Sequence, residues 1–258
     1  MKKYIAFITT LSFAVGILSS CHDKPELIAT TSAPDGVAYV KVGDFAPNFR
    51  TVFGNKPDSF NVFVNNQKIS GSYLSYGGLY PTTTNLYAAV PAGAVTIKMT
   101  QGITNPDSVT LISLNKTLTA GAYYSLLVTD SVQTAGEPKQ IFVQDNFSRV
   151  DTLHYMLRFA HTILTDTAGK NVDVWSQRLK TNIFSNIAPG TVTAFTTQPY
   201  FYVADTFSVR RAGTTNELTK LSTLALPIGR ERAYTLVYKG TSDAASTKPR
   251  SLVYYNNQ

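Results

Sequence analysis

Cysteine and histidine, which serve as nucleophiles, proton carriers and metal ligands, are few in this sequence. The chain has one cysteine, Cys21, and three histidines: His22, His154 and His161. His154 and His161 are seven positions apart in a strand-like run, so in a regular strand their side chains face opposite sides of the sheet. A structural zinc site needs four cysteine or histidine ligands in one place. The sequence therefore predicts no metal site and no cofactor.

The local patterns of common hydrolases are also missing. The chain has no Gly-x-Ser-x-Gly turn, and its acids fall mostly in turn-like pairs such as Pro106-Asp107. Residues 166–173 supply oxygen ligands and a glycine but lack the spaced acids of an EF-hand, so we interpret them as an inter-strand loop. We expect a protein that is not an enzyme. A secreted hydrolase is the least favoured alternative, since catalytic triads are defined by geometry and not by residue order.

The single cysteine has a specific context at the N-terminus. A basic start, Met1–Lys3, precedes an apolar run at 5–18 that is too short to span a membrane but fits a signal peptide. The next residues, Leu18-Ser19-Ser20-Cys21, resemble the lipobox of bacterial lipoproteins, in which the cysteine is diacylated and becomes the mature N-terminus. Two acyl chains anchor a protein much more firmly than one. We predict a signal peptide at 1–20 and a lipid anchor at Cys21.

The segment after the cysteine bears on which way the protein faces. Residues 22–26 include two acids, and such a segment is similar to the surface-export signals of Bacteroidetes lipoproteins. We expect an outer-membrane lipoprotein facing outward, with a periplasm-facing anchor as the alternative. Residues 21–36 are rich in Pro, Thr and Ser, which predicts a flexible tether.

Charge argues against nucleic acid as a partner. The full chain carries a net charge of +7, and loss of residues 1–20 removes two lysines and no acid. The basic residues are scattered, whereas a nucleic-acid-binding protein concentrates them on one face. We expect no nucleic-acid partner.

The remaining chain predicts an all-β fold. Val95, Ile97 and Met99 alternate with polar residues as in a half-buried strand, and similar runs recur with Gly, Pro, Asn and Asp clusters between them. Helical periodicity is hard to find after the signal peptide.

The second half of the chain repeats the first. Several strand-like residues recur at an offset of 110 positions: Ile97 and Phe207, Leu111 and Leu221, Tyr124 and Tyr234, Val143 and Val253. The segment 40–42 matches 157–159 at an offset of 117. A repeat of this length with about seven short strands predicts two tandem immunoglobulin-like antiparallel β-sandwich domains, at 37–147 and 148–258.

The repeated pattern resembles the domain-of-unknown-function family numbered 4397. The resemblance is carried by five segments of the first copy: Val40-Lys41-Val42, Asn61–Asn66, Tyr76-Gly77, Tyr87 with Pro91-Ala92-Gly93, and Gly121 before Tyr123–Leu126. The second copy keeps the strands but has Ala188-Pro189 in place of Tyr-Gly. These motifs imply a fold and no chemistry.

Aromatic residues beside turns are the candidate ligand contacts. Tyr76 and Tyr80 flank Gly77-Gly78, and Tyr200-Phe201-Tyr202 follows Pro199. An exposed Tyr on a rigid loop can stack on a sugar or anchor a protein, whereas Tyr at strand ends more often packs in a sandwich core. We take Tyr76 and Tyr80 as the candidate binding residues.

Four short triplets have the form Asp, then Ser or Thr, then Val, Leu or Ala. This form resembles the acceptor triplet of Bacteroidetes O-glycosylation, and the acceptors would be Ser108, Ser131, Thr152 and Thr167. Asp-Ser pairs also favour turns, so the triplets have a structural explanation as well.

The sequence thus favours a non-enzymatic, membrane-anchored binding or adhesion module for a glycan or protein at the cell envelope. The alternative is a structural accessory subunit of an envelope complex that has no ligand of its own.

Overall fold

The computed structural model describes residues 36–47, 59–82, 85–101, 110–129, 140–164, 170–222, 229–241 and 247–258. The predicted signal peptide, the lipid anchor at Cys21 and the predicted acceptors Ser108, Ser131 and Thr167 lie outside these ranges. Within them, no helix is long and apolar enough to cross a membrane.

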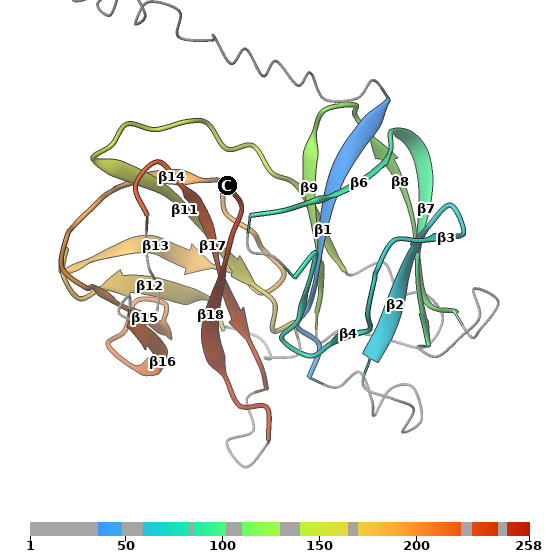
Figure 1. The fold of residues 1–258 in the computed structure, drawn as a ribbon. Helices are drawn as coiled ribbons and strands as arrows, with labels where there is room; N and C mark the ends of the chain where they lie inside the picture. The colour runs from blue at the N-terminus through green and yellow to red at the C-terminus, as the bar shows by residue number, and fades with distance from the viewer. Residues whose placement is uncertain are drawn as a thin grey trace, which may run out of the picture. The chain divides into compact units, whose positions relative to one another are not determined.

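The first half of the chain forms two sheets (Figure 1). Sheet A has the order β10-β9-β1-β5, with β6 also paired to β1; its strands are β1 (Val37–Asp44), β5 (Leu79–Tyr80), β6 (Ala88–Pro91), β9 (Tyr123–Val128) and β10 (Ile141–Gln144). Sheet B has the order β3-β2-β7-β8, with β4 paired to β2; its strands are β2 (Ser59–Val64), β3 (Gln67–Lys68), β4 (Leu74–Ser75), β7 (Gly93–Gln101) and β8 (Thr110–Leu118).

The second half forms two further sheets with a similar strand order. Sheet C has the order β14-β11-β17-β18; its strands are β11 (His154–His161), β14 (Thr196–Pro199), β17 (Ala233–Lys239) and β18 (Ser251–Asn256). Sheet D has the order β13-β12-β15-β16; its strands are β12 (Val172–Ser176), β13 (Thr181–Ile187), β15 (Thr206–Arg211) and β16 (Glu217–Ser222). The predicted all-β fold with tandem sandwiches is confirmed.

The repeat extends to strand register. Val40 of β1 lies opposite Tyr124 of β9, and the repeat-related Leu157 of β11 lies opposite Tyr234 of β17. The central pair of each half therefore has the same alignment, although the two copies differ in most side chains.

The prediction of antiparallel sheets is wrong for that central pair. β1 runs parallel to β9, and β11 runs parallel to β17. Period-two alternation shows which face of a strand is buried but not the direction of its neighbour. Parallel strands are typically covered on both faces. Accordingly all seven residues of β17 and the last five of β1 are buried.

Three apolar clusters account for this burial. One fills the first sandwich around Phe60, Ile97 and Met99, and a second fills the other sandwich around Phe159 and Phe207. The third joins side chains of sheet A and sheet C: Phe45, Leu127 and Ile141 from the first half, and Ala160, Val237 and Tyr255 from the second. Sheets A and C therefore each pack against a sheet of their own sandwich and against each other.

Candidate functional site: the aromatic loop after strand β14

The two predicted binding tyrosines lie in different environments. Tyr80 is in β5, opposite Val42, and packs half-buried against the core of the first sandwich. Tyr76 follows β4 and is also half-buried. The Nζ atoms of Lys239 and Lys248 lie 4.0 and 4.7 Å from the centre of its ring. The structure thus gives Tyr76 polar surroundings and Tyr80 an apolar packing role.

The other predicted positions in the described chain are also located. Thr152 is exposed in a turn next to Asp151, whose Oδ1 accepts a hydrogen bond from the Leu153 amide and lies 2.6 Å from Nδ1 of His154. The hydrogen bonds that Asp151 forms with His154 and with the Leu153 amide lower the pKa of its carboxyl group. His161 is fully buried, with its ring 5.1 Å from that of Tyr238. Among the described residues, no group of three His, Cys, Asp or Glu side chains is arranged to hold a metal ion.

Among the described residues, four of the six exposed large apolar side chains lie in the loop after β14 or beside it. We define the aromatic loop as Tyr200–Val203 together with Leu153, because the Tyr200 amide donates a 2.7 Å hydrogen bond to the Leu153 carbonyl. Tyr202 is 77% exposed, Val203 and Leu153 are each 63% exposed, and Phe201 is 39% exposed. Large apolar side chains are usually buried, because burial stabilises the fold. A group of them that is exposed to solvent on one part of the surface marks a candidate binding site.

One side of the aromatic loop is held by Arg230. The guanidinium carbon lies 5.3 Å from the ring centre of Tyr200 and 4.8 Å from that of Tyr202. Nη2 of the same residue donates a hydrogen bond to the Tyr202 hydroxyl. The two tyrosine rings meet edge to face, 5.3 Å apart at 78°. Cation–π and edge-to-face contacts of this kind fix the orientation of exposed rings.

The other side of the aromatic loop is held by Arg178. Its guanidinium lies 5.4 Å from the ring of Phe201, and its Nη2 donates a 2.9 Å hydrogen bond to the Ala204 carbonyl. The next residue, Asp205, accepts hydrogen bonds from the Arg178 amide (2.8 Å) and from the Ser176 hydroxyl. The loop is therefore tied to the turn between β12 and β13, and its aromatic side chains are exposed without being loose.

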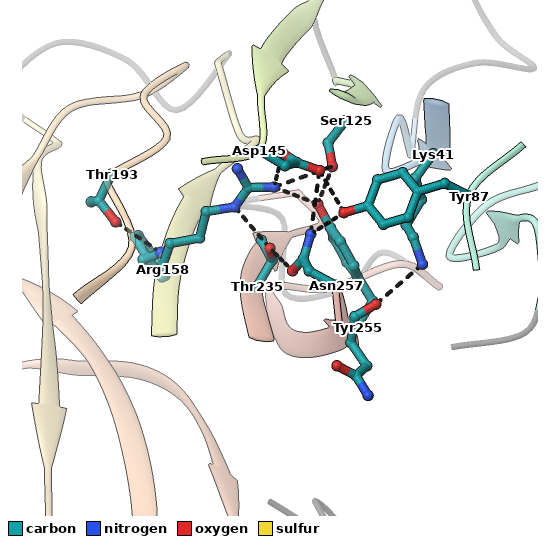
Figure 2. Close-up of polar contacts among 11 residues, drawn as sticks. Lys41, Tyr87, Ser125, Asp145, Arg158, Thr193, Thr235, Tyr255 and Asn257 are labelled. Carbon is teal, nitrogen blue, oxygen red and sulfur yellow. Dashed lines mark hydrogen bonds and ion pairs between the residues drawn. The ribbon is translucent and has the colours of Figure 1, made fainter. Parts of the chain in front are cut away.

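A cluster of polar side chains lies at the interface between sheets A and C, here called the seam (Figure 2). Arg158 of β11 and Asp145 form an ion pair of 2.7 Å, with 1% and 0% of their side chains exposed. Arg158 also donates to Ser125 (3.1 Å) and to the Tyr255 hydroxyl (3.2 Å). These groups have no access to solvent, so the cluster joins the two sandwiches and offers no surface to a ligand.

Two further groups of the seam have shifted pKa values. Burial and the nearby Asp145 charge raise the pKa of Tyr87, whose hydroxyl donates a 2.6 Å hydrogen bond to Asp145. Burial lowers the pKa of Lys41 to about 8, partly opposed by Asp145. Lys41 donates to the Asn256 carbonyl at 3.1 Å.

Sequence reasoning named the aromatic run at 200–202 but missed the arginines that position it. Arg230 is 28 positions from Tyr202, and Arg178 is 23 positions from Phe201, so neither is recognisable as a neighbour.

With this geometry established, the family follows from comparison with known proteins. The family model described as Domain of unknown function (DUF4397) matches residues 38–175. This protein belongs to that family. The match begins in β1 and ends in β12, so it covers the first sandwich and reaches the start of the second.

The other comparisons give less information about this DUF4397 protein. No curated protein matches the chain. A solved structure of "putative polysaccharide binding proteins (DUF1812)" from Bacteroides thetaiotaomicron VPI-5482 is 10% identical. The alignment covers 79% of this chain and 92% of that chain, with a TM-score of 0.25. A likeness of that size does not bear on function.

Proposed function

We propose that this DUF4397 protein is a non-catalytic binding module, anchored to the cell envelope through Cys21, that holds a glycan on its aromatic loop. The observation that carries the proposal is the state of Tyr202: it is 77% exposed, yet Arg230 fixes its ring and its hydroxyl. Binding loses less entropy when exposed aromatic groups are already held in place.

The chemistry of the loop suits a sugar. A tyrosine ring has an apolar face on which a sugar ring can stack, and its hydroxyl group can form hydrogen bonds. A guanidinium group has five N–H donors, and one donor of Arg230 is engaged by Tyr202. Because the guanidinium lies over the Tyr200 and Tyr202 rings, its other donors can bind hydroxyls or carboxylates of a sugar held at the loop. Loss of residues 1–20 lowers the net charge from +7 to +5, and a positive charge favours an anionic glycan.

The size of the loop favours a glycan over a protein. Four large apolar side chains are exposed here: Leu153, Phe201, Tyr202 and Val203. A stable protein interface engages about 20–30 residues on each side. A few stacking side chains suffice for one or two sugar rings.

The charged side chains that contact the aromatic rings and backbone of the loop hold it in place. Arg178 and Arg230 lie over its rings, and the Asp205 carboxylate accepts hydrogen bonds from the backbone amides of Arg178 and Thr206. We therefore propose binding without catalysis.

A glycan array with the purified chain tests this function. We expect saturable binding that falls by at least about tenfold in Tyr202→Ser, because a buried stacking contact is worth roughly 1–3 kcal/mol. Tyr73→Ser is the matched control, since Tyr73 is also an exposed tyrosine (48%) with a cation, Lys68, above its ring. Tyr76→Ala and Tyr80→Ala test the two candidates proposed from sequence.

Absence of glycan binding by the wild type, or equal binding by Tyr202→Ser, would sink the proposal. Retention of an envelope protein by the wild type but not by Tyr202→Ser would instead assign the loop to a structural subunit. Orientation is tested by protease treatment of intact cells carrying the wild type or Cys21→Ala. Cleavage in intact cells supports an outward-facing anchor, and cleavage only after lysis supports a periplasm-facing one.

A further inference from the structure

A separate cationic cluster lies where the end of sheet C meets the turn after β4. Lys239 is the last residue of β17, and Lys248 lies shortly before β18. The ammonium groups of both lie over the ring of Tyr76, at 4.0 and 4.7 Å from its centre. Lys248 also donates a 3.3 Å hydrogen bond to the Pro47 carbonyl. Two positive charges are thus collected at one aromatic ring.

The Lys239 ammonium is costly in this position. The residue is only 8% exposed, and within the described part of the chain no hydrogen bond or ion pair holds its ammonium group. Burial lowers the pKa of Lys239, the Asp44 charge opposes that change, and the Lys248 charge adds to it. Two ammonium groups at one ring, one of them nearly buried, attract an anion strongly because their surroundings are partly desolvated.

The backbone leaves room beside this ammonium group. Gly77 is exposed and has a φ of +82°, a conformation that favours glycine. A Cβ atom at this position would lie 3.2 Å from Nζ of Lys239. Glycine therefore leaves the space beside Nζ of Lys239 unfilled by a side chain.

We propose that Lys239, Lys248 and Tyr76 form a binding site for a phosphate-type oxyanion. Each ammonium group has three N–H donors, and charge-assisted hydrogen bonds to phosphate oxygens are among the stronger ones in proteins. The Tyr76 ring contacts both ammonium groups through its face, and one donor of Lys248 is engaged by the Pro47 carbonyl. The phosphate could belong to a free phosphate ester or to a lipid headgroup. This inference does not rest on the proposed glycan site.

Calorimetric titration of the full chain with inorganic phosphate, at constant ionic strength set with chloride, tests the site. We expect saturable binding in the wild type and a loss of about tenfold or more in affinity in Lys239→Met, which removes one charge-assisted contact. Lys116→Met is the matched control, because Lys116 also lies over a ring, that of Phe142 at 5.3 Å. Tyr202→Ser should keep phosphate binding, which separates this site from the aromatic loop.

Flotation with vesicles distinguishes the source of the phosphate. Lys239-dependent binding to phosphatidic acid vesicles but not to free phosphate supports a lipid headgroup, and binding of free phosphate supports a soluble ester. If Lys239→Met fails to fold, Lys248→Met replaces it, since Lys248 is more exposed. The proposal is overturned if neither phosphate source binds the wild type, or if both lysine variants bind as the wild type does.

Discussion

Arg158 and Asp145 form an ion pair across the seam between the two halves of the chain, with nitrogen and oxygen 2.7 Å apart and both side chains almost fully buried. Arg158 belongs to β11 of sheet C, whereas Asp145 directly follows β10 of sheet A. Tyr255 and Asn257 of the second half add hydrogen bonds to Ser125 and Tyr87 of the first. The two sandwiches are therefore joined by a polar cluster as well as by an apolar one.

Loss of one partner of this pair should destabilise the protein strongly. Arg158→Met leaves the Asp145 carboxylate buried without its counter-ion, which costs about 3–5 kcal/mol. Urea denaturation at neutral pH measures the free energy of unfolding. Lys220→Met is the control, because Lys220 pairs with Glu217 at the surface (65% and 35% exposed) and exposed pairs contribute about 1 kcal/mol or less. A loss below about 1 kcal/mol for Arg158→Met would contradict the role of the pair.

The buried Lys41 predicts that stability rises with pH above neutrality. Its pKa is lowered from 10.5 to about 8 in the folded protein, so between those values the unfolded chain binds more protons than the folded one. The free energy of unfolding then increases as the pH rises from 8 to 10.5, by up to about 3 kcal/mol. Below pH 8 the cost of burying the charge is fully present.

Lys41→Met isolates this effect. We expect urea denaturation curves of the variant to lose the part of the pH dependence that comes from Lys41, while Lys239, whose pKa burial also lowers, keeps its own part. Lys116→Met, which changes the charge equally at a partly exposed site, should keep it. An unchanged slope in Lys41→Met would show that the Lys41 ammonium is not the group responsible.

Arg230 should matter for ligand binding more than for folding. Arg230→Met removes the hydrogen bond to Tyr202 and the cation above two rings. We expect glycan affinity to fall by about tenfold, because an unbraced loop must be ordered on binding. The melting temperature should change little, since the contacts are exposed. Arg149→Met, an equal charge change at another exposed position, is the control. A large fall in melting temperature with unchanged affinity would contradict this prediction.

Gly240 is the position where a side chain is least tolerated. Its φ is +112°, and a Cβ atom would lie 2.2 Å from the Pro249 carbonyl oxygen. Gly240→Ala should therefore destabilise the protein by more than about 2 kcal/mol, from backbone strain and the clash together. Gly121→Ala separates the two causes. Gly121 also has a positive φ, +74°, but nothing lies within 4 Å of its Cβ position, so about 1 kcal/mol is expected. Equal losses in thermal unfolding would show that the contact with Pro249 relaxes.

Parts of the candidate site were accessible from sequence and parts were not. The run at 200–202 stands out because three aromatic residues follow a proline, which is a loop signal. Tyr76 stands out beside Gly77 for a similar reason. Neither sequence pattern shows which cationic side chains lie above the aromatic rings. Arg230, Lys239 and Lys248 reach those rings from segments separated by long stretches of chain, and local patterns carry no information about such contacts.

The amino-acid sequence by itself determined the strands, the all-β fold, the family and the repeat. Alternation of apolar and polar residues follows from the two faces of a strand, so it is visible locally. Only the tertiary structure decided that β1 and β9 are parallel, that sheets A and C pack together, and that Asp145 meets Arg158. The reason is that a strand buried on both faces loses the alternation that would mark its inner side. The sequence indicates that a charged residue in such a strand must pair with another group. Which residue that group belongs to depends on how the two sandwiches pack.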